Sequence, residues 1–337
     1  MMTKRITILL LACFILHSCE KDIVNPNTSY ISNFETFWQT MDKHYVFFNE
    51  KGVNWDEVYA TYAPKFQQVV SDKQALALYQ EIVSKLNDRH VWVGKGNLIA
   101  SVQPRLQPSI EFGRTYIHYD FDNLALLEHY HLAQLPSSIV YIRMLSMPVL
   151  NTEIELINSL IAEYDYYNGV VFDIRDCTGG QIQGFEVCGL FFEGERVVLY
   201  NQYRDGVNHN SFTKPYPVIV KGTGMIDGSN PLAVLTNANT FSMGNSVASI
   251  LNDLTSSTLL GEKSGGGAGG TNPVLLGNGW YFQYTVCKTL NLAMELTEDG
   301  INPDIEVVLP VDYWTTTHQE TGIDPQLDKA LEILLIN

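Results

Sequence analysis

The second half of the chain alternates between helical and strand patterns, and this alternation constrains the fold more than any other feature. Apolar residues recur at helical spacing after Thr152. The predicted strands are Gly169–Ile174, Leu232–Thr236 and Ser257–Gly261, and further helices follow Gly180 and Ser242. Repeated helix and strand units build a sheet covered by helices, with ligand sites outside the carboxyl ends of the strands. We therefore predict an α/β fold.

The segment from Ser32 to Leu86 has a different pattern, with apolar residues at the spacing of three amphipathic helices. Two of these helices begin with capping-box spacing, Ser32 with Glu35 and Ser71 with Gln74. Shorter β-rich segments follow the helices. The strands predicted there are Ser109–Phe112, Thr115–Phe121 and Ile139–Leu145.

A glycine-rich loop, a hairpin and a helix complete the pattern. They are expected at Gly265–Gly270, around an Asn278-Gly279 turn, and at Leu327–Leu335. No internal repeat and no long Pro- or Ser-rich linker separates the parts of the chain. We therefore predict a helical cap domain at residues 31–95 that is docked on a core at residues 96–337.

The first residues resemble a bacterial lipoprotein signal. Two basic residues precede an apolar run at 6–16, and a segment similar to a lipobox ends at Cys19. The run is shorter than the ~20 residues that a transmembrane helix needs, so we expect residues 1–18 to be removed as a signal peptide. The resemblance implies a lipid on Cys19, a polar tether at 19–30, and a place in the cell envelope, at the outer membrane or periplasmic face. Membrane contact is then through the lipid only.

Charge and cysteine content exclude several kinds of site. The formal net charge of −16 has the wrong sign for a protein that tracks nucleic-acid phosphates, so we expect no nucleic-acid partner. Besides Cys13 and Cys19 the chain has Cys177, Cys188 and Cys287, without CxxC or His/Cys metal-ligand spacing. We expect no metal site, no cofactor and no disulfide framework, while a Cys177–Cys188 bridge stays open.

Five segments with catalytic residue types occur in a characteristic order. They are Leu86–Val91, Val171–Gly180, Val234–Gly266, Gly300–Asp304 and Asp324–Leu331. In this order they resemble the S41 serine peptidases, the tail-specific and tricorn-core-like proteases, over residues 30–336. The resemblance implies a ClpP/crotonase-like, helix-covered β-sheet body with a small N-terminal helical domain, and a serine-type endopeptidase.

Ser242 is the predicted nucleophile. A strand that ends near Thr236 and a helix that starts at the serine place its hydroxyl where backbone amides and the positive end of the helix dipole converge. The amide of Met243 and the turn formed by Gly179 and Gly180 are the predicted oxyanion hole. Serine is also a preferred N-cap residue, which gives a structural alternative for Ser242 considered alone.

A serine nucleophile needs a positioned base. Tail-specific relatives carry a lysine in the loop after the Gly-Glu-Lys element, but Gly267 stands at that place. The resemblance to tricorn-like relatives instead implies that His90, in a Leu-x-Asp-x-His segment, is the general base. Lys263 is the alternative base.

A serine and a glutamate steer the histidine in tricorn-like relatives. The glutamate corresponds to Glu298, or to Asp299 if the loop shifts by one residue, whereas Arg89 stands in place of the serine. This departure leaves open how the imidazole is oriented, and an unoriented base costs orders of magnitude in rate. Asp173 and Arg175 are predicted to form a buried structural ion pair.

These features together predict a lipid-anchored serine endopeptidase of the cell envelope that cleaves peptides or unfolded proteins. Fifty residues separate His90 from Tyr141, too few for a complete PDZ-type domain. Arg89 motivates an alternative, a catalytically weak or inactive module that binds a peptide or a hydrophobic ligand. An acyl-CoA-handling enzyme of the crotonase fold is disfavoured, because the signal places the chain outside the cytosol. The sequence assigns no oligomeric state.

Overall fold

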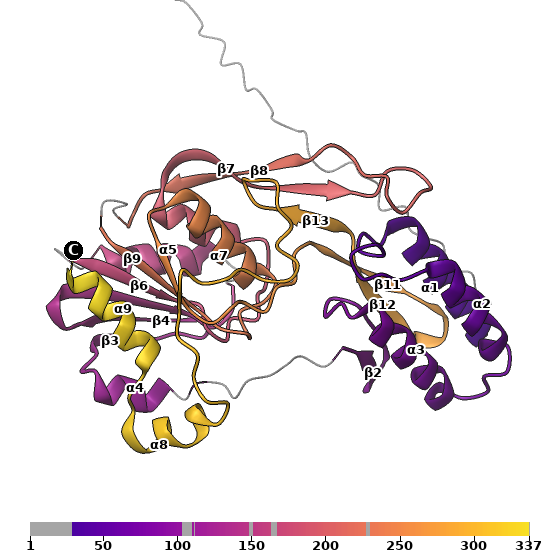
Figure 1. Cartoon of the computed structure of the whole chain (residues 1–337), viewed down its shortest axis with the longest axis horizontal. Helices are drawn as coiled ribbons and strands as arrows, with labels where there is room; N and C mark the ends of the chain where they lie inside the picture. The colour runs from indigo at the N-terminus through magenta and orange to yellow at the C-terminus, as the bar shows by residue number, and fades with distance from the viewer. Residues whose placement is uncertain are drawn as a thin grey trace, which may run out of the picture.

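The protein is an α/β protein, as predicted (Figure 1). The computed structural model describes residues 29–102, 110, 112–147, 151–162, 167–226 and 230–336. The predicted signal peptide, Cys19 and most of the tether lie outside these residues, as do two of the four residues of the predicted strand Ser109–Phe112, whose last residue begins a helix instead. No helix within the described ranges is long and apolar enough to cross a bilayer.

The body is built on a seven-stranded sheet in the order β14-β10-β9-β6-β5-β4-β3. Its strands are β3 Asp122–Leu126, β4 Tyr130–Leu135, β5 Ile139–Met144, β6 Gly169–Asp173, β9 Leu232–Thr236, β10 Thr258–Gly261 and β14 Ile305–Glu306. Strands β5, β6, β9, β10 and β14 are parallel, whereas β3 and β4 are antiparallel additions at one edge. The predicted strands 139–145, 169–174, 232–236 and 257–261 are confirmed as β5, β6, β9 and β10, within one residue at either end.

Helices cover both faces of this sheet (Figure 1). They are α4 Phe112–His118, α5 Asn151–Ile161, α6 Gly184–Cys188, α7 Met243–Leu254, α8 Thr317–Thr321 and α9 Pro325–Ile336. Residues of α5, α6 and α7 pack on the face to which Val170 and Phe172 point, and α4 and α9 pack on the face to which Val171 points. Because side chains alternate along a strand, a sheet covered on both faces needs strands that are apolar throughout, as β6 is.

The N-terminal part begins with the three predicted helices, α1 Tyr30–His44, α2 Trp55–Phe66 and α3 Asp72–Leu86. Ser71 caps α3 by accepting the N–H of Gln74, as predicted. The predicted cap of α1 at Ser32 is wrong, because the helix begins two residues earlier. Ser29 is the N-cap instead. Its hydroxyl accepts the N–H of Ser32, which has no acceptor within the first turn of the helix.

A second sheet packs on these helices in the order β11-β12-β1-β2. Its strands are β1 Trp92–Lys95, β2 Leu98–Ser101, β11 Thr271–Leu275 and β12 Tyr281–Thr285. The β11–β12 hairpin turns at Asn278 and Gly279, with φ of 58° and 76°, as its sequence predicts. Trp280 and Phe282 of the hairpin share one apolar core with the three helices. Part of the predicted core therefore packs with the predicted cap, and the boundary at residue 95 stays a prediction.

A third sheet, in the order β13-β7-β8, is not among the predicted elements. Its strands are β7 Glu193–Tyr203, β8 Tyr216–Thr223 and β13 Cys287–Leu290. The β7–β8 hairpin extends from the body toward the N-terminal helices (Figure 1). There Arg204 donates to the carbonyl of Tyr45 at 3.4 Å, and His209 contacts Asp42 at 2.9 Å. The hairpin thus links the two parts of the molecule.

The predicted strand Thr115–Phe121 is wrong, because most of this segment forms α4. Thr115 bonds His318 at 2.8 Å, and Tyr119, one helical turn later, bonds Asp328 at 2.7 Å. The N–H of Tyr119 donates to the carbonyl of Thr115 at 3.0 Å, so the helical turn continues to this residue. Residues four apart lie on one side of a helix, which brings both side chains to the C-terminal segment. These tertiary contacts override the β-propensity of an aromatic and β-branched run.

Candidate active site

Ser242 lies at the turn between β9 and α7. It occupies the N-cap position of α7 with φ 56° and ψ −120°, and its side chain makes no capping hydrogen bond. The turn is fixed by the N–H of Ser242, which donates to Gly266 at 2.9 Å, and by that of Phe241, which donates to Cys177 at 3.0 Å. A serine held at positive φ on a strand-to-helix turn is strained and presents its hydroxyl outward. The hydroxyl is therefore not used as a helix cap.

His90 lies in the turn that follows α3. Asn87 ends the helix in the left-handed conformation with φ 47°, and Asp88 Oδ1 accepts the N–H of His90 at 2.8 Å. The second oxygen of Asp88 accepts the hydroxyls of Tyr45 and Thr285 at 3.0 and 2.8 Å. This buried cluster ties the histidine turn to the end of α1 and to the end of β12.

The side chains of His90 and Ser242 meet in the structure. His90 Nε2 lies 2.9 Å from Ser242 Oγ, although the two residues are 152 positions apart. The imidazole also packs on the ring of Phe241, with 4.7 Å between the ring centroids. Burial lowers the pKa of His90 below its ordinary 6.5. The neutral imidazole, whose Nε2 can accept a proton from the serine, is thus the favoured form at neutral pH.

The other ring nitrogen of His90 has no hydrogen-bond partner in the part of the chain that the structure describes. Nδ1 is buried and makes no hydrogen bond within the described residues. If Nε2 accepts the serine proton, Nδ1 must carry the hydrogen of the neutral ring. That N–H lacks the acceptor that orients the base in a Ser-His-acid triad. The backbone bond to Asp88 and the contact with Phe241 hold the imidazole instead.

Glu298, the predicted orienting acid, bonds elsewhere. Its Oε1 lies 2.9 Å from Lys51 Nζ, and its Oε2 accepts the N–H of Ala268 at 2.8 Å. Burial, reinforced by Asp88, raises the pKa of Glu298 to about 7, against the opposing effect of Lys51. Among the described residues no hydrogen bond joins Glu298 to His90. Its role toward the base stays a prediction.

The turn of Gly179 and Gly180 lies directly against the nucleophile. A Cβ atom on Gly179, whose φ is +101°, would come within 2.8 Å of Ser242 Cβ and 2.9 Å of Met243 N. Only glycine allows this approach. Met243 is the first residue of α7, so its N–H has no acceptor within the helix. Of the three residues predicted to form the oxyanion hole, Gly179 and Met243 therefore lie beside Ser242, whereas Gly180 packs against Met147.

A cleft of about 480 Å³ is lined by Arg89 and Phe241, the residues that precede His90 and Ser242 in the chain, whereas His90 and Ser242 are not part of its lining. Its lining includes Lys51, Arg89, Phe241, Lys263, Glu298 and Asp299. The alternative site residues Lys263 and Asp299 are exposed there, and in the described part of the chain neither bonds His90 or Ser242. Gly267 lies so close to Phe241 that any Cβ would clash with the ring, which leaves no room for a lysine at that position.

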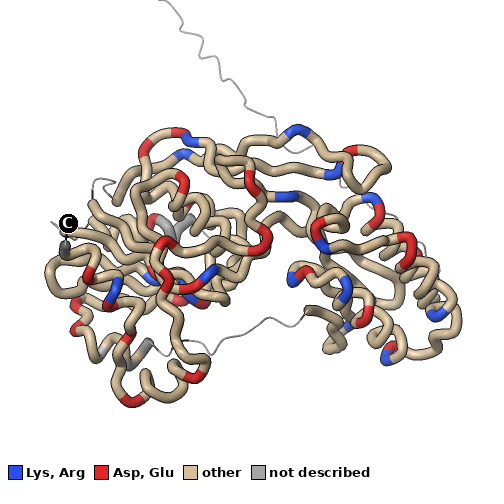
Figure 2. Tube along the Cα trace, viewed as in Figure 1, with Lys and Arg blue, Asp and Glu red and all other residues tan. Residues whose placement is uncertain are grey.

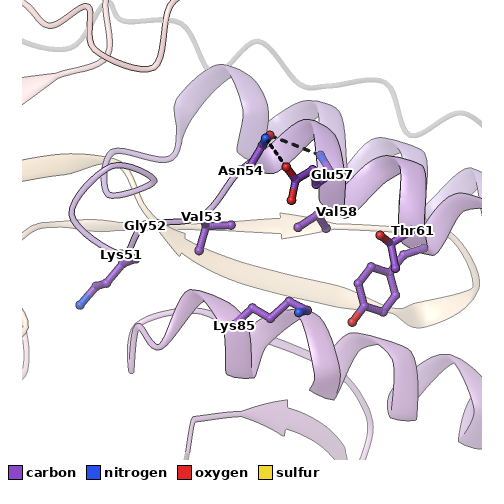
Figure 3. A pocket seen from close by; sticks show the side chains of 9 residues that line it. Lys51, Gly52, Val53, Asn54, Glu57, Val58, Thr61 and Lys85 are labelled. Atoms are coloured by element: carbon purple, nitrogen blue, oxygen red, sulfur yellow. Dashed lines mark hydrogen bonds between the residues drawn. The ribbon is translucent and has the colours of Figure 1, made fainter.

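A second pocket of about 310 Å³ lies between the loop that precedes α2 and helices α2 and α3 (Figure 3). At its rim Asn54 accepts the N–H of Glu57 and donates to its carboxylate, which caps α2. Lys51 stands at the edge, and its ammonium is directed away from the pocket (Figure 3). None of the predicted site residues lines this pocket.

The ion pair of Asp173 and Arg175 is confirmed as a buried structural element. Arg175 Nη2 lies 2.6 Å from Asp173 and 2.8 Å from Asp324, and all three side chains are fully buried.

The sequence analysis missed the roles of Asp88 and Lys51. An aspartate two residues before His90 has the spacing of an Asx turn, which is a usable signal. Lys51 lies in a turn whose residue types are those of an ordinary surface loop, so the sequence gives no comparable signal for its contact with the site.

Two family matches cover both parts of the chain. Residues 138–307, half of the chain, match peptidase family S41. The chain belongs to this family. Residues 26–84 match the tricorn protease C1 domain, and His90 lies between the two matched ranges. This S41 peptidase is thus a hydrolase of the serine-peptidase type, with peptides or proteins as its substrates.

Solved structures share the fold of this S41 peptidase. A protein of Parabacteroides merdae ATCC 43184, described as a candidate peptidase, aligns with a TM-score of 0.78 and 25% identity over 92% of this chain and 98% of its own. Mature CPAF aligns with a TM-score of 0.63 and 10% identity over 87% and 95% of the two chains. The tricorn protease aligns with a TM-score of 0.60 and 13% identity over 91% and 36%. No curated protein sequence matches the chain.

Proposed function

We propose that this S41 peptidase is a serine endopeptidase that cleaves peptides or unfolded proteins through an acyl-enzyme on Ser242. The observation that carries the proposal is the 2.9 Å separation of His90 Nε2 and Ser242 Oγ. His90 takes the hydroxyl proton as Oγ attacks the scissile carbonyl, and then gives this proton to the leaving amine. A water molecule activated by the same nitrogen hydrolyses the ester and restores the serine.

The carbonyl oxygen becomes negatively charged in the tetrahedral intermediates. We assign its stabilisation to the amide of Met243 and to the turn of Gly179 and Gly180. The close approach of this turn to Ser242 supports the assignment. A preorganised donor of this kind is worth roughly 3 kcal/mol of barrier lowering.

A second candidate function is the binding of a peptide or a hydrophobic ligand with little turnover. It is favoured by one observation, the buried Nδ1 of His90 that has no acceptor within the described residues. A base without an orienting acid can adopt the unproductive tautomer, which lowers the rate. Recovery of intact peptide after long incubation, together with measurable binding, would favour this candidate.

Covalent labelling of Ser242 tests the proposed function. We expect a fluorophosphonate to modify the parent protein at Ser242, located by mass spectrometry of the digested product, and to leave Ser242→Ala unmodified. Ser159→Ala is the matched control, because this exposed serine lies on α5 and should not affect labelling. Equal labelling of the parent and Ser242→Ala would sink the assignment of the nucleophile.

The pH dependence of kcat/KM is expected to reflect the buried base. Burial lowers the pKa of His90, Lys51 and Arg89 lower it further, and Asp88 opposes them. The neutral base therefore persists below the ordinary value of 6.5, and kcat/KM should fall only as the pH drops through this lowered pKa. Lys51→Met should move the midpoint to higher pH. An acid limb centred at or above 6.5 in the parent would contradict this prediction.

We further propose that the protein is anchored in the cell envelope through a lipid on Cys19. The support is the sequence alone, in which a short apolar run ends at a segment similar to a lipobox. Cys19→Ser is expected to move the protein from the membrane fraction to the soluble fraction of lysed cells. Cys13→Ser is the matched control and should leave the fractionation unchanged. Membrane association of both variants alike would exclude the lipid anchor.

A further inference from the structure

The cleft beside Ser242 has a different charge from the protein as a whole. The chain has a formal net charge of −16, and its acidic residues are spread over the whole trace (Figure 2). The lining of the cleft nevertheless contains three cationic side chains and two acidic ones. They are Lys51, Arg89, Lys263, Glu298 and Asp299.

Only part of this charge is compensated within the protein. Lys51 is neutralised by Glu298, with 2.9 Å between the charged atoms, and Asp299 acts on the same lysine. Arg89 and Lys263 form no ion pair with any described residue. Lys263 is exposed, whereas Arg89 is half-buried. The cleft therefore presents uncompensated positive charge next to the nucleophile.

Arg89 is held in place while using little of its hydrogen-bonding capacity. Its guanidinium lies over the ring of Phe241, 3.8 Å from the ring centroid, and Nη1 donates one long bond of 3.5 Å to the carbonyl of Gly265. A Cβ at Gly265 would come within 3.0 Å of Nη1, so the glycine makes room for the guanidinium. An arginine has five N–H donors in a planar fork that matches a carboxylate. The remaining donors have no acceptor among the described residues.

The position of Arg89 in the chain places this fork beside the reacting atoms. It is the residue before His90, and Phe241, on which it stacks, is the residue before Ser242. Arg89 and His90 both pack on the ring of Phe241, 3.8 and 4.7 Å from its centroid, and His90 Nε2 lies 2.9 Å from Ser242 Oγ. The guanidinium is thus separated from the catalytic pair by no more than this ring, and an anion bound to it lies near the substrate attacked by Ser242. A stacked guanidinium loses little freedom on binding, which favours a strong bidentate contact.

We propose that Arg89 is a specificity residue that binds a carboxylate of the peptide substrate near the scissile bond, with Lys263 adding long-range attraction. The carboxylate comes either from an acidic side chain or from the carboxyl terminus of the substrate. This inference rests on the proposed serine peptidase function and names its substrate class. It also gives a role to the residue that replaces the serine expected before His90.

The test compares peptides that differ only in their carboxylates. Cleavage sites of the full-length protein are first mapped in reduced, carbamidomethylated α-lactalbumin, and one cleaved peptide is synthesised in three forms. One form is unchanged, one has amides in place of its acidic side chains, and one has an amidated carboxyl terminus. Values of kcat and KM are measured at about pH 8, where His90 is neutral in every variant. The proteins are the parent, Arg89→Met, and Arg196→Met, an exposed arginine outside the cleft lining.

We expect one of the two amide forms to be cleaved by the parent about tenfold less efficiently than the unchanged peptide, mainly through KM. The form that loses efficiency identifies the source of the carboxylate. The difference should shrink to about twofold or less in Arg89→Met and persist in Arg196→Met. In the parent the preference for the unchanged peptide over the amide form should also decline between about 50 mM and about 500 mM salt, because the cleft is open to solvent.

Two outcomes separate the failure of this inference from the failure of the proposed function. Equal cleavage of all three peptides by the parent, or a preference that salt does not change, overturns the role of Arg89 while Ser242 remains the nucleophile. Absence of cleavage, together with absence of fluorophosphonate labelling, overturns the proposed peptidase itself.

Discussion

Alanine in place of His90 is expected to lower kcat/KM by about 10³-fold or more, and alanine in place of Ser242 to lower it at least as much. His90 Nε2 is the nitrogen within hydrogen-bond distance of Ser242 Oγ, so its loss leaves the hydroxyl without a base. The double variant should be no slower than Ser242→Ala alone. The two groups share one proton, and removal of either disables the other.

The measurement is the hydrolysis of an unfolded protein by the parent, the two single variants and the double variant. His118→Ala is the matched control, because this exposed histidine lies on α4, outside the cleft lining, and should leave kcat/KM unchanged. Unchanged urea midpoints would confirm that the variants fold. If His90→Ala digests the substrate as fast as the parent, another group is the base, and Lys263 is the first to examine. Additive losses would mean that the two residues act separately.

The nucleophile turn could be predicted because its determinants are local. A strand pattern that ends at Thr236 and a helix pattern that starts after Ser242 place the serine at their junction, and the structure has both elements there. The position of His90 has another origin. It depends on the pairing of β1 with β12, in which Trp92 stands opposite Gln283. No local pattern encodes that pairing, so only the family resemblance suggested His90 as the base.

The distinction between local and long-range determinants also explains which other features could be predicted from the sequence. The turn at Asn278 and Gly279 was predictable from its chemistry, whereas the partner of the hairpin, the N-terminal sheet, was not. The contact between Lys51 and Glu298 joins a loop of the N-terminal part to a loop of the body. Such a pair arises from the way the two parts pack, and it engages the carboxylate that was predicted to orient the histidine.

Arg175→Met is expected to lower the free energy of unfolding by roughly 3–5 kcal/mol. Arg175 donates to both oxygens of Asp173, at 2.9 and 2.6 Å, and to both oxygens of Asp324, at 3.0 and 2.8 Å. None of the three side chains is exposed. Methionine fills a similar volume but leaves two buried carboxylates without the guanidinium that both of them bond, and most of their desolvation is then uncompensated. Asp324 also caps α9 through Leu327, so the loss should extend to that helix.

The effect of pH distinguishes this electrostatic cost from a packing defect. In the parent, burial raises the pKa of Asp173, but Arg175, aided by Arg143 and Tyr141, outweighs burial and holds this pKa below its ordinary value. The stabilisation is therefore present above the unfolded pKa of about 3.9 and is lost as the pH falls through the lowered folded value.

Without Arg175, burial raises the pKa of Asp173 against only the weaker opposing effects of Arg143 and Tyr141, and the carboxyl groups can take up protons as the pH falls. The difference in urea-unfolding free energy between parent and Arg175→Met should thus be largest at neutral pH and shrink toward about pH 5. The control is Lys329→Ala, which removes an exposed pair with Glu332 and should cost about 1 kcal/mol or less at either pH. A difference that does not depend on pH would mean that Arg175 stabilises the sheet through packing against Trp314 rather than through its charge.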